Sequence, residues 1–241
     1  MTGNRLQAQA RAGQGGFPRA ALFDLDGTLL DSALDMLATA NRLRGDRGIA
    51  PMALAELRPH VSKGARAMLA AAFPQIAQAG REAMVAEFLA VYQQELGRHS
   101  RLFDGVETML SALERHGAVW GIVTNKPEYL ARQILPQLGW ESRCAVLIGG
   151  DTLAEKKPHP LPLQVAAERI GIAIDGCVYV GDDERDIVAA RAAGMPSIAA
   201  LWGYRLDGEQ PQSWQPDAMC ELPQDLAEPA AWPTPPVPRT L

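Results

Sequence analysis

The chain has 241 residues, of which 47% are hydrophobic, and 28 Asp and Glu outnumber 23 Lys and Arg to give a net charge of −5. This length and composition suit one large globular domain or two smaller ones with a proper core. The acidic balance argues against general nucleic-acid binding, and no apolar stretch approaches the ~20 residues of a membrane-spanning helix, so we expect neither partner.

The chain is predicted to begin with a flexible extension over residues 1–18, which contain two arginines and no acidic residue. This segment lacks the apolar stretch of a secretory signal. From Arg19 the sequence "RAALFDLDGTLL" is apolar and then turns at a Gly-Thr pair. It predicts a buried strand that ends in a turn, and we assign residues 19–34 to the core domain.

Residues 35–100 are rich in Ala, Leu, Arg and Met and contain no convincing strand. Stretches at 34–45, 63–73 and 81–97 are each typical of a helix. An insert of this kind directly after the first strand predicts a small helical cap domain over the end of a sheet. Its eight Lys and Arg against six Asp and Glu favour an anion that enters beneath it.

Residues 101–221 are predicted to complete the core domain. Apolar runs at 118–125, 145–151, 177–183 and 197–203 are typical of parallel strands that are covered on both faces. Helical stretches at 106–117, 161–171 and 186–194 each stop at a glycine. This alternation predicts an α/β fold with a doubly wound, mostly parallel sheet.

The C-terminal segment 222–241 is rich in proline, and we expect an extended or disordered tail. The alternative interpretation of this segment is that Trp232 serves as a docking anchor. The three cysteines, Cys144, Cys177 and Cys220, are widely spaced and odd in number, which favours reduced thiols and a cytoplasmic location.

Polar residues follow the predicted strands, where ligands bind in open α/β sheets. These residues are Asp24, Asp26, Thr124, Asn125, Lys157, Asp182, Asp183 and Asp186. Taken singly, each has a structural alternative as a turn, a helix cap or a solvated loop residue. Their shared position at the ends of apolar runs favours a common site.

The residue types at these positions suit phosphoryl transfer. A carboxylate such as that of Asp24 can attack phosphorus, and a second one two residues on can act as general acid and then base. Several carboxylates repel one another unless a hard cation such as Mg²⁺ lies among them. A hydroxyl at Thr124 and the backbone N–H groups of the Leu25–Gly27 turn can hold phosphate oxygens, and Lys157 supplies positive charge.

Four stretches, "FDLDGTLLDS", "IVTNKP", "KKPHPLPL" and "VGDDERDI", resemble in order the four motifs of the haloacid dehalogenase superfamily of phosphohydrolases. The resemblance extends from about Arg19 to Tyr204. It implies that Asp24 is the nucleophile and Asp26 the acid/base, and that Lys157 steadies the phosphate and the nucleophile. The implied phosphate-binding residues are Thr124, Asn125, Leu25 and Gly27.

The same resemblance implies that Mg²⁺ is held by Asp24, Asp182 and the backbone carbonyl of Asp26. It also implies that Asp186 positions Lys157 and that Asp183 supports the site. Within the superfamily, "KKPHPLPLQVAAERIGI" is similar to phosphoglycolate phosphatases. The cap stretches "RGDRGI" and "VSKGARAML" most resemble N-acetylmuramic acid 6-phosphate phosphatases.

Both of these substrates carry a carboxylate, so a cationic cap residue is expected to face the site. Lys63 and Arg66 are the candidates, although both are equally typical of solvated helix positions. The expected function is Mg²⁺-dependent hydrolysis of a small carboxylate-bearing phosphomonoester. A phosphomutase of the same fold and a non-catalytic interaction protein remain as alternatives, and a monomer and a homodimer are both open.

Overall fold

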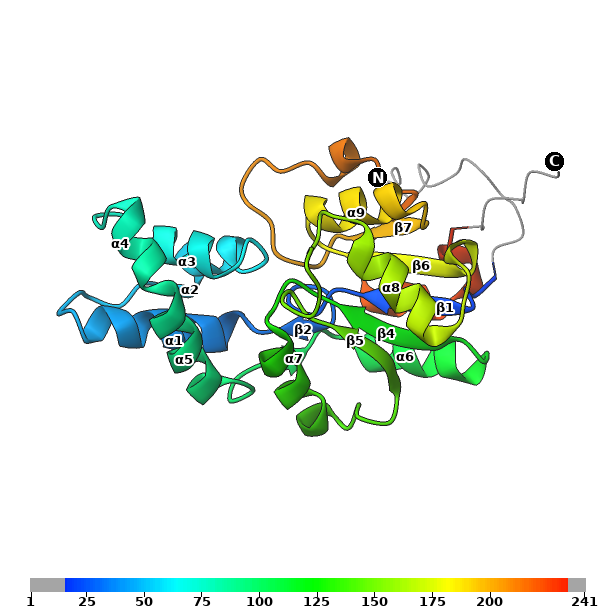
Figure 1. Ribbon diagram of the computed structural model, residues 1–241, viewed down its shortest axis with the longest axis horizontal. Coiled ribbons are helices and arrows are strands. Elements are labelled where there is room, and N and C mark those ends of the chain that lie inside the picture. Colours follow the sequence, from blue (N-terminus) through cyan, green and yellow to red (C-terminus); the bar gives the residue numbers. More distant parts are fainter. Residues whose placement is uncertain (1–15, 234–241) are drawn as a thin grey trace, which may run out of the picture.

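A six-stranded sheet lies at the centre of the larger lobe in the computed structural model, which describes residues 16–233 (Figure 1). The strand order is β5-β4-β1-β6-β7-β8, and every neighbouring pair is parallel. The strands are β1 (Ala20–Phe23), β4 (Val119–Val123), β5 (Cys144–Ile148), β6 (Cys177–Gly181), β7 (Ser197–Ala200) and β8 (Ala218–Cys220). The predicted mostly parallel sheet is confirmed, and β8 is a strand that the sequence analysis did not predict.

Helices cover both faces of this sheet. Side chains of a strand alternate between its two faces. In β1, Ala21 and Phe23 therefore join the apolar cluster of α6 and α7, whereas Ala20 and Leu22 join that of α8 and α9. These helices are α6 (Val106–Arg115), α7 (Glu128–Ile134), α8 (Leu161–Ile170) and α9 (Glu184–Ala193). The doubly wound arrangement is confirmed.

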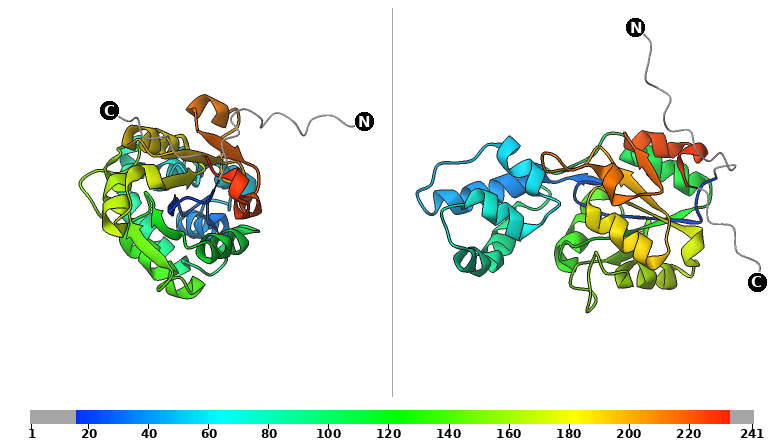
Figure 2. Two further views of the ribbon diagram at one scale, coloured as in Figure 1. Left: turned by 90° about the vertical axis from the view of Figure 1, so that its right-hand side faces the viewer. Right: turned by 90° about the horizontal axis from the view of Figure 1, so that it is seen from above.

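The smaller lobe is entirely helical within the described residues and forms a cap beside the sheet (Figure 1). Its helices are α1 (Ala33–Gly45), α2 (Leu54–Leu57), α3 (Ala65–Ala72), α4 (Gln78–Ala83) and α5 (Val85–Glu95). The single helix predicted over 81–97 is wrong, because α4 and α5 are separate helices that meet at Met84. Figure 2 shows that the cap joins the core through a narrow neck.

The neck consists of two short strands, β2 (Leu30–Asp31) and β3 (Arg101–Leu102), which pair antiparallel. Asp35, in the first turn of α1, is fully buried beside them. Its carboxylate accepts hydrogen bonds from the backbone N–H groups of Gly97 (2.8 Å) and His99 (2.7 Å) and from the Ser100 hydroxyl (2.5 Å). Asp35 thus ties the outgoing chain to the returning chain.

The described part of the proline-rich segment packs against the core, so the prediction of an extended or disordered tail is wrong for residues 222–233. Two 3₁₀ turns, Pro223–Ala227 and Pro229–Ala231, each begin with a proline, where a missing N–H costs no hydrogen bond. Leu226 and Trp232 are buried, and the Trp232 indole N–H donates to the Leu226 carbonyl (2.9 Å).

The predicted N-terminal extension 1–18 and the last part of the tail fall largely outside the described residues. All three cysteines carry free thiols, as expected. None of the helices within residues 16–233 combines the length and the hydropathy that a membrane span requires.

Candidate active site

The carboxyl ends of the central strands bring the predicted polar residues to one edge of the sheet. Asp24 directly follows β1, Thr124 follows β4 and Asp182 follows β6. A cavity of about 430 Å³ lies between this edge and the cap. It is lined from the core by Asp24, Asp26, Thr124, Asn125, Lys126 and Lys157, and from the cap by Lys63, Arg66, Met68, Phe88 and Tyr92.

Lys157 lies in the loop after β5, buried between two carboxylates. Its Nζ is 3.1 Å from Asp24 Oδ1 and 2.7 Å from Asp186 Oδ1, and it also donates to the Tyr179 hydroxyl (2.7 Å). Burial alone would lower the pKa of Lys157, but the charges of Asp186 and Asp24 outweigh it and raise this pKa. Lys157 therefore stays cationic and holds Asp24 in place.

The fourth motif forms the N-terminus of α9. Asp183 is the N-cap residue, and its side chain accepts from the Arg185 N–H (3.0 Å) while Asp186 Oδ2 accepts from the Asp183 N–H (3.0 Å). This reciprocal capping box fixes the orientation of Asp186. The other Asp186 oxygen is the one that holds Lys157, so the cap of a helix also positions the lysine.

Asp182 is fully buried beneath the turn that follows β1. Gly27 has φ +89°, and a Cβ added to it would lie 2.2 Å from Asp182 Oδ2, so only glycine fits this turn. Burial, together with the charges of Asp24 and Asp186, raises the pKa of Asp182 well above its usual range. The salt bridges among the described residues give Asp182 no cationic partner.

These features fit a hard divalent cation. Carboxylate oxygens of Asp24, Asp182 and Asp186 lie within 4.8 Å of one another. Asp186 is already engaged by Lys157 and by the capping box, which leaves Asp24 and Asp182 as the better ligands. The Ser62 hydroxyl donates to Asp182 Oδ2 (2.7 Å), and its oxygen also lies 3.4 Å from the Asp26 carbonyl oxygen, so these two acceptor oxygens face one point. The residues named for Mg²⁺ from the sequence thus lie together.

The predicted phosphate-binding groups differ in whether their hydrogen-bond donors are already engaged by other groups of the protein. The Thr124 oxygen accepts a hydrogen bond from the Lys126 N–H (3.2 Å), which leaves the Thr124 hydroxyl proton available to a ligand. Asn125 donates its amide to the Lys157 carbonyl (2.9 Å) and so supports the lysine loop. The N–H of Leu25 bonds to Asp24 Oδ1 (2.7 Å) and that of Gly27 to the Leu30 carbonyl (3.0 Å).

Sequence reasoning missed Lys126, which lies between Asn125 and Pro127 in the second motif. Its Nζ contacts both carboxylate oxygens of Asp26 (3.1 and 3.0 Å) and the Tyr92 hydroxyl of α5 (2.6 Å). The lysine was visible in "IVTNKP", but nothing in that pattern indicates that it is buried or that a cap tyrosine reaches it.

The two cap cations named from the sequence have different surroundings. Lys63 contacts Asp183 (2.7 Å) and Glu209 (2.5 Å), and Arg185 donates to Asp183 (2.6 Å) and to the Ser62 carbonyl. Lys63, Asp183, Arg185 and Glu209 form what we term the cap latch. Arg66 instead pairs with Glu82, and its side chain is 64% exposed.

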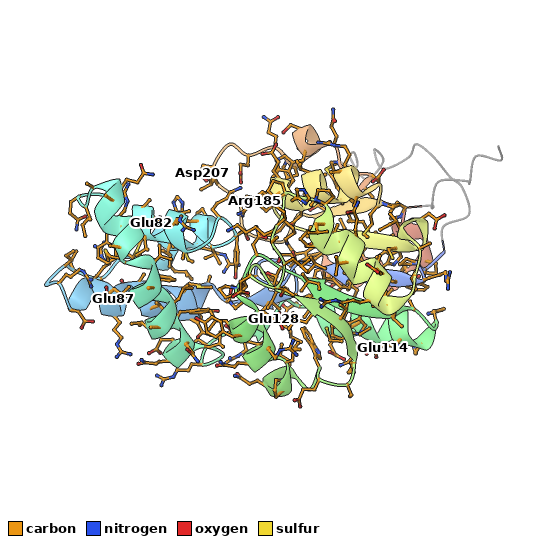
Figure 3. All side chains as sticks on the ribbon, viewed as in Figure 1. Glu82, Glu87, Glu114, Glu128, Arg185 and Asp207 are labelled. Atoms are coloured by element: carbon orange, nitrogen blue, oxygen red, sulfur yellow. The ribbon has the colours of Figure 1, made fainter. Side chains whose placement is uncertain are left out.

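The cap latch lies where the core faces the cap. Figure 3 shows Arg185 at this edge of the core, whereas Glu82 lies on the cap itself. Burial would raise the pKa of Asp183, but Arg185 and Lys63 outweigh it and lower this pKa to about 2. Asp183 is therefore ionised at any neutral or mildly acidic pH, and the latch is an ion-pair network.

The family model of the haloacid dehalogenase-like hydrolases matches residues 21–200. The chain belongs to this family. It is 69% identical over 219 residues to a phosphoglycolate phosphatase of Xanthomonas campestris pv. campestris, covering 91% of this chain and 99% of that protein. It is 39% identical over 216 residues to an N-acetylmuramic acid 6-phosphate phosphatase of Pseudomonas aeruginosa, covering 87% and 93% of the two chains.

Among solved structures, a predicted phosphoglycolate phosphatase from Haemophilus somnus superposes with a TM-score of 0.77. It is 26% identical in sequence and covers 89% of this chain and 98% of that one. These similarities confirm the expected superfamily and the expectation of an enzyme of the phosphoglycolate phosphatase type.

Proposed function

We propose that the protein is a Mg²⁺-dependent phosphomonoesterase that works through an aspartyl-phosphate on Asp24. The observation that carries this proposal is the buried contact between Lys157 and Asp24, with a second carboxylate, Asp26, in the same cavity. The proposed substrate is a small phosphomonoester with a carboxylate, either 2-phosphoglycolate or N-acetylmuramic acid 6-phosphate. The activities named for the relatives support this class of substrate.

In the first step, Asp24 attacks the phosphorus atom. Its Oδ1 accepts from Leu25 N–H and lies 3.1 Å from Lys157 Nζ, whereas Oδ2 accepts no hydrogen bond from the described residues. Oδ2 is therefore the oxygen that is free to bond to phosphorus. As that bond forms, the ester P–O bond breaks, and the departing alcohol oxygen takes a proton from Asp26.

In the second step, Asp26 takes a proton from a water molecule, and the water oxygen bonds to phosphorus. The bond between phosphorus and Asp24 breaks, which releases inorganic phosphate and restores the carboxylate. Throughout, Thr124 and Lys157 hold phosphate oxygens. Mg²⁺ held by Asp24, Asp182 and the Asp26 carbonyl would supply positive charge that offsets the repulsion between phosphate and carboxylates.

The ion pairs of the cap cations favour hydrolysis over phosphomutase chemistry. A mutase needs a second phosphate-binding site in the cap. Lys63 is already neutralised by two carboxylates, and Arg66 is paired with Glu82 on an exposed face. No cation of the described cap residues that line the cavity is therefore left without a carboxylate partner. The expected contact between a free cap cation and the substrate carboxylate is accordingly absent among these residues, and the proposed substrate class rests on the activities named for the relatives.

The test compares kcat/KM for 2-phosphoglycolate and N-acetylmuramic acid 6-phosphate in the presence of Mg²⁺. Asp24→Asn should lower kcat by about a thousandfold or more because the nucleophile is lost. Mass spectrometry of the quenched reaction should find one phosphoryl group on the peptide that contains Asp24.

Asp46→Asn is the matched control, since Asp46 is an exposed carboxylate at the end of α1, and it should keep wild-type activity. Full activity of the Asp24→Asn variant, or turnover that survives removal of Mg²⁺ by a chelator, would contradict the proposal.

A further inference from the structure

We infer that Lys126 and the cap residue Tyr92 position Asp26 for proton transfer, so that the acid–base group is complete only when the cap lies on the core. This inference rests on the proposed role of Asp26. It assigns to Lys126 and Tyr92 the work of positioning residues, because they act on the substrate through Asp26.

Lys126 is the middle member of a buried series of hydrogen bonds that runs from Asp26 in the core to Tyr92 in the cap. The lysine side chain is only 3% exposed, and its ammonium lies 3.0–3.1 Å from the two carboxylate oxygens of Asp26. The same ammonium donates to the Tyr92 hydroxyl and lies 4.4 Å from the centroid of its ring. Tyr92 belongs to α5 of the cap, so this series of hydrogen bonds exists only while the cap lies against the core.

The contacts of Asp26 leave one of its oxygens available for chemistry. Oδ1 accepts from both the Ser32 hydroxyl (2.6 Å) and Lys126, whereas Oδ2 accepts only from Lys126 among the described residues. Without Lys126, the carboxylate would be tied by Ser32 alone and could rotate about that contact. Lys126 thus fixes the plane of the carboxylate at the wall of the cavity, and Oδ2 is the oxygen with fewer hydrogen-bond partners.

Tyr92 can hold the Lys126 ammonium without adding a negative charge that would compete with the Asp26 carboxylate for it. Burial, together with the charges of Asp26 and Asp35, raises the pKa of Tyr92 well above its usual value, so the phenol remains neutral. A neutral hydroxyl and an aromatic face stabilise an ammonium in place. Lys126 could instead bind substrate phosphate directly, and this alternative predicts a different kinetic pattern.

The distinguishing measurement is the dependence of kcat/KM on the leaving group. This ratio reports the reaction only as far as the first irreversible step, the transfer of the phosphoryl group to Asp24. An alkyl ester such as 2-phosphoglycolate needs a proton from Asp26 as its alcohol departs, whereas p-nitrophenyl phosphate has a leaving group that needs none.

Lys126→Met should lower kcat/KM for 2-phosphoglycolate by about tenfold to a hundredfold, in keeping with the size of general acid catalysis. The same variant should lower kcat/KM for p-nitrophenyl phosphate by less than about threefold. Tyr92→Phe keeps the ring and removes only the hydroxyl, so it should shift the ratio of the two values in the same direction by a smaller factor.

Two further variants make the result specific. In an Asp26→Asn background, Lys126→Met should cause no additional change in the ratio, because the group that it positions is already lost. Lys156→Met removes another lysine that lines the cavity and should leave the ratio as in the wild type. Lys126→Gln replaces Lys126→Met if thermal melting shows that the methionine variant is unfolded.

An equal loss of kcat/KM for both substrates would overturn the inference, because it would indicate a phosphate ligand or a general structural role. An unchanged ratio would overturn it as well. If the wild type hydrolyses neither ester, the proposed function itself fails, which is a separate and distinguishable result.

Discussion

Asp182 is a buried carboxylate that accepts several hydrogen bonds but has no cationic partner within residues 16–233. Its oxygens accept from Thr28 (3.1 Å), Ser62 (2.7 Å) and the Tyr204 N–H (2.9 Å). These hydrogen bonds favour the charged form, but burial and two neighbouring aspartates outweigh them and raise the pKa of Asp182. The metal-free fold therefore pays a free-energy cost for keeping Asp182 ionised, and a bound divalent cation would remove that cost.

This cost predicts how pH affects the stabilisation by Mg²⁺. The folded pKa of Asp182 lies above its unfolded value, so the stability of the metal-free protein falls as pH rises from the unfolded pKa towards the folded one. The increase in melting temperature on adding Mg²⁺ should therefore be larger at pH about 8 than at pH about 5.

The matched control is Asp182→Asn, which cannot ionise at this position. Its melting temperature should respond much less to Mg²⁺, and the response should depend little on pH. A wild-type response that is equal at both pH values would contradict the assignment of Asp182 to the metal site.

At the residue scale, the sequence identified the groups that follow the strands, because chemistry and position coincide there. Lys157 and Asp186 were expected to act together, and they lie 2.7 Å apart. Lys126 was not identified, since its role depends on burial by α5, a helix more than thirty positions away. Contacts of this kind arise from cap docking, which no local pattern encodes.

At the scale of elements, the turns after the last strand pack against α6, on one side of the sheet. The 3₁₀ turn Pro223–Ala227 packs on α6, and Trp232 is only 2% exposed. The sequence prediction failed here because proline runs are typical of extended chain. Two prolines at turn starts, with apolar residues between them, are also compatible with compact turns. The three-residue strand β8 was missed because it is too short to show a pattern.

Trp232→Ala should lower the free energy of unfolding by about 3–5 kcal/mol, because it leaves a large cavity against Leu226. Urea unfolding followed by circular dichroism gives this value. Deletion of residues 222–241 should be at least as harmful, since it uncovers α6.

The control is Leu222→Ala in the same segment, because the Leu222 side chain is 47% exposed. This variant should change the free energy of unfolding by less than about 1 kcal/mol. Equal stability of the wild type and the Trp232→Ala variant would show that the segment does not contribute to the fold.

For the molecule as a whole, Tyr204 of the core connects the core to the first helix of the cap. Its hydroxyl accepts from the N–H groups of Ser32 (2.8 Å) and Ala33 (3.1 Å) at the start of α1 and donates to Asp31 (2.7 Å). Arg58 of the cap holds the same aspartate (2.9 Å) and lies 4.8 Å from the Tyr204 ring. The first cap helix is thus capped by a core residue.

Tyr204→Phe should destabilise the protein by about 1–3 kcal/mol, because the Ser32 N–H loses its buried partner and the Ala33 N–H keeps only a long contact to Asp31 (3.4 Å). Urea unfolding measures this change, and faster cleavage by a protease at the neck would show that the cap has loosened. Tyr129→Phe is the control, since Tyr129 is an exposed tyrosine on α7. Equal losses in the two variants would contradict the role given to Tyr204.

The neck between the lobes has a consequence for how such an enzyme can change. Because β2 and β3 lie side by side and Asp35 ties their ends together, the cap leaves and re-enters the core at a single place. A segment with adjacent ends can be exchanged without breaking the sheet. Asp24 and Lys157 can therefore be retained while a different cap is inserted, and a cap with other side chains over the cavity would admit other substrates.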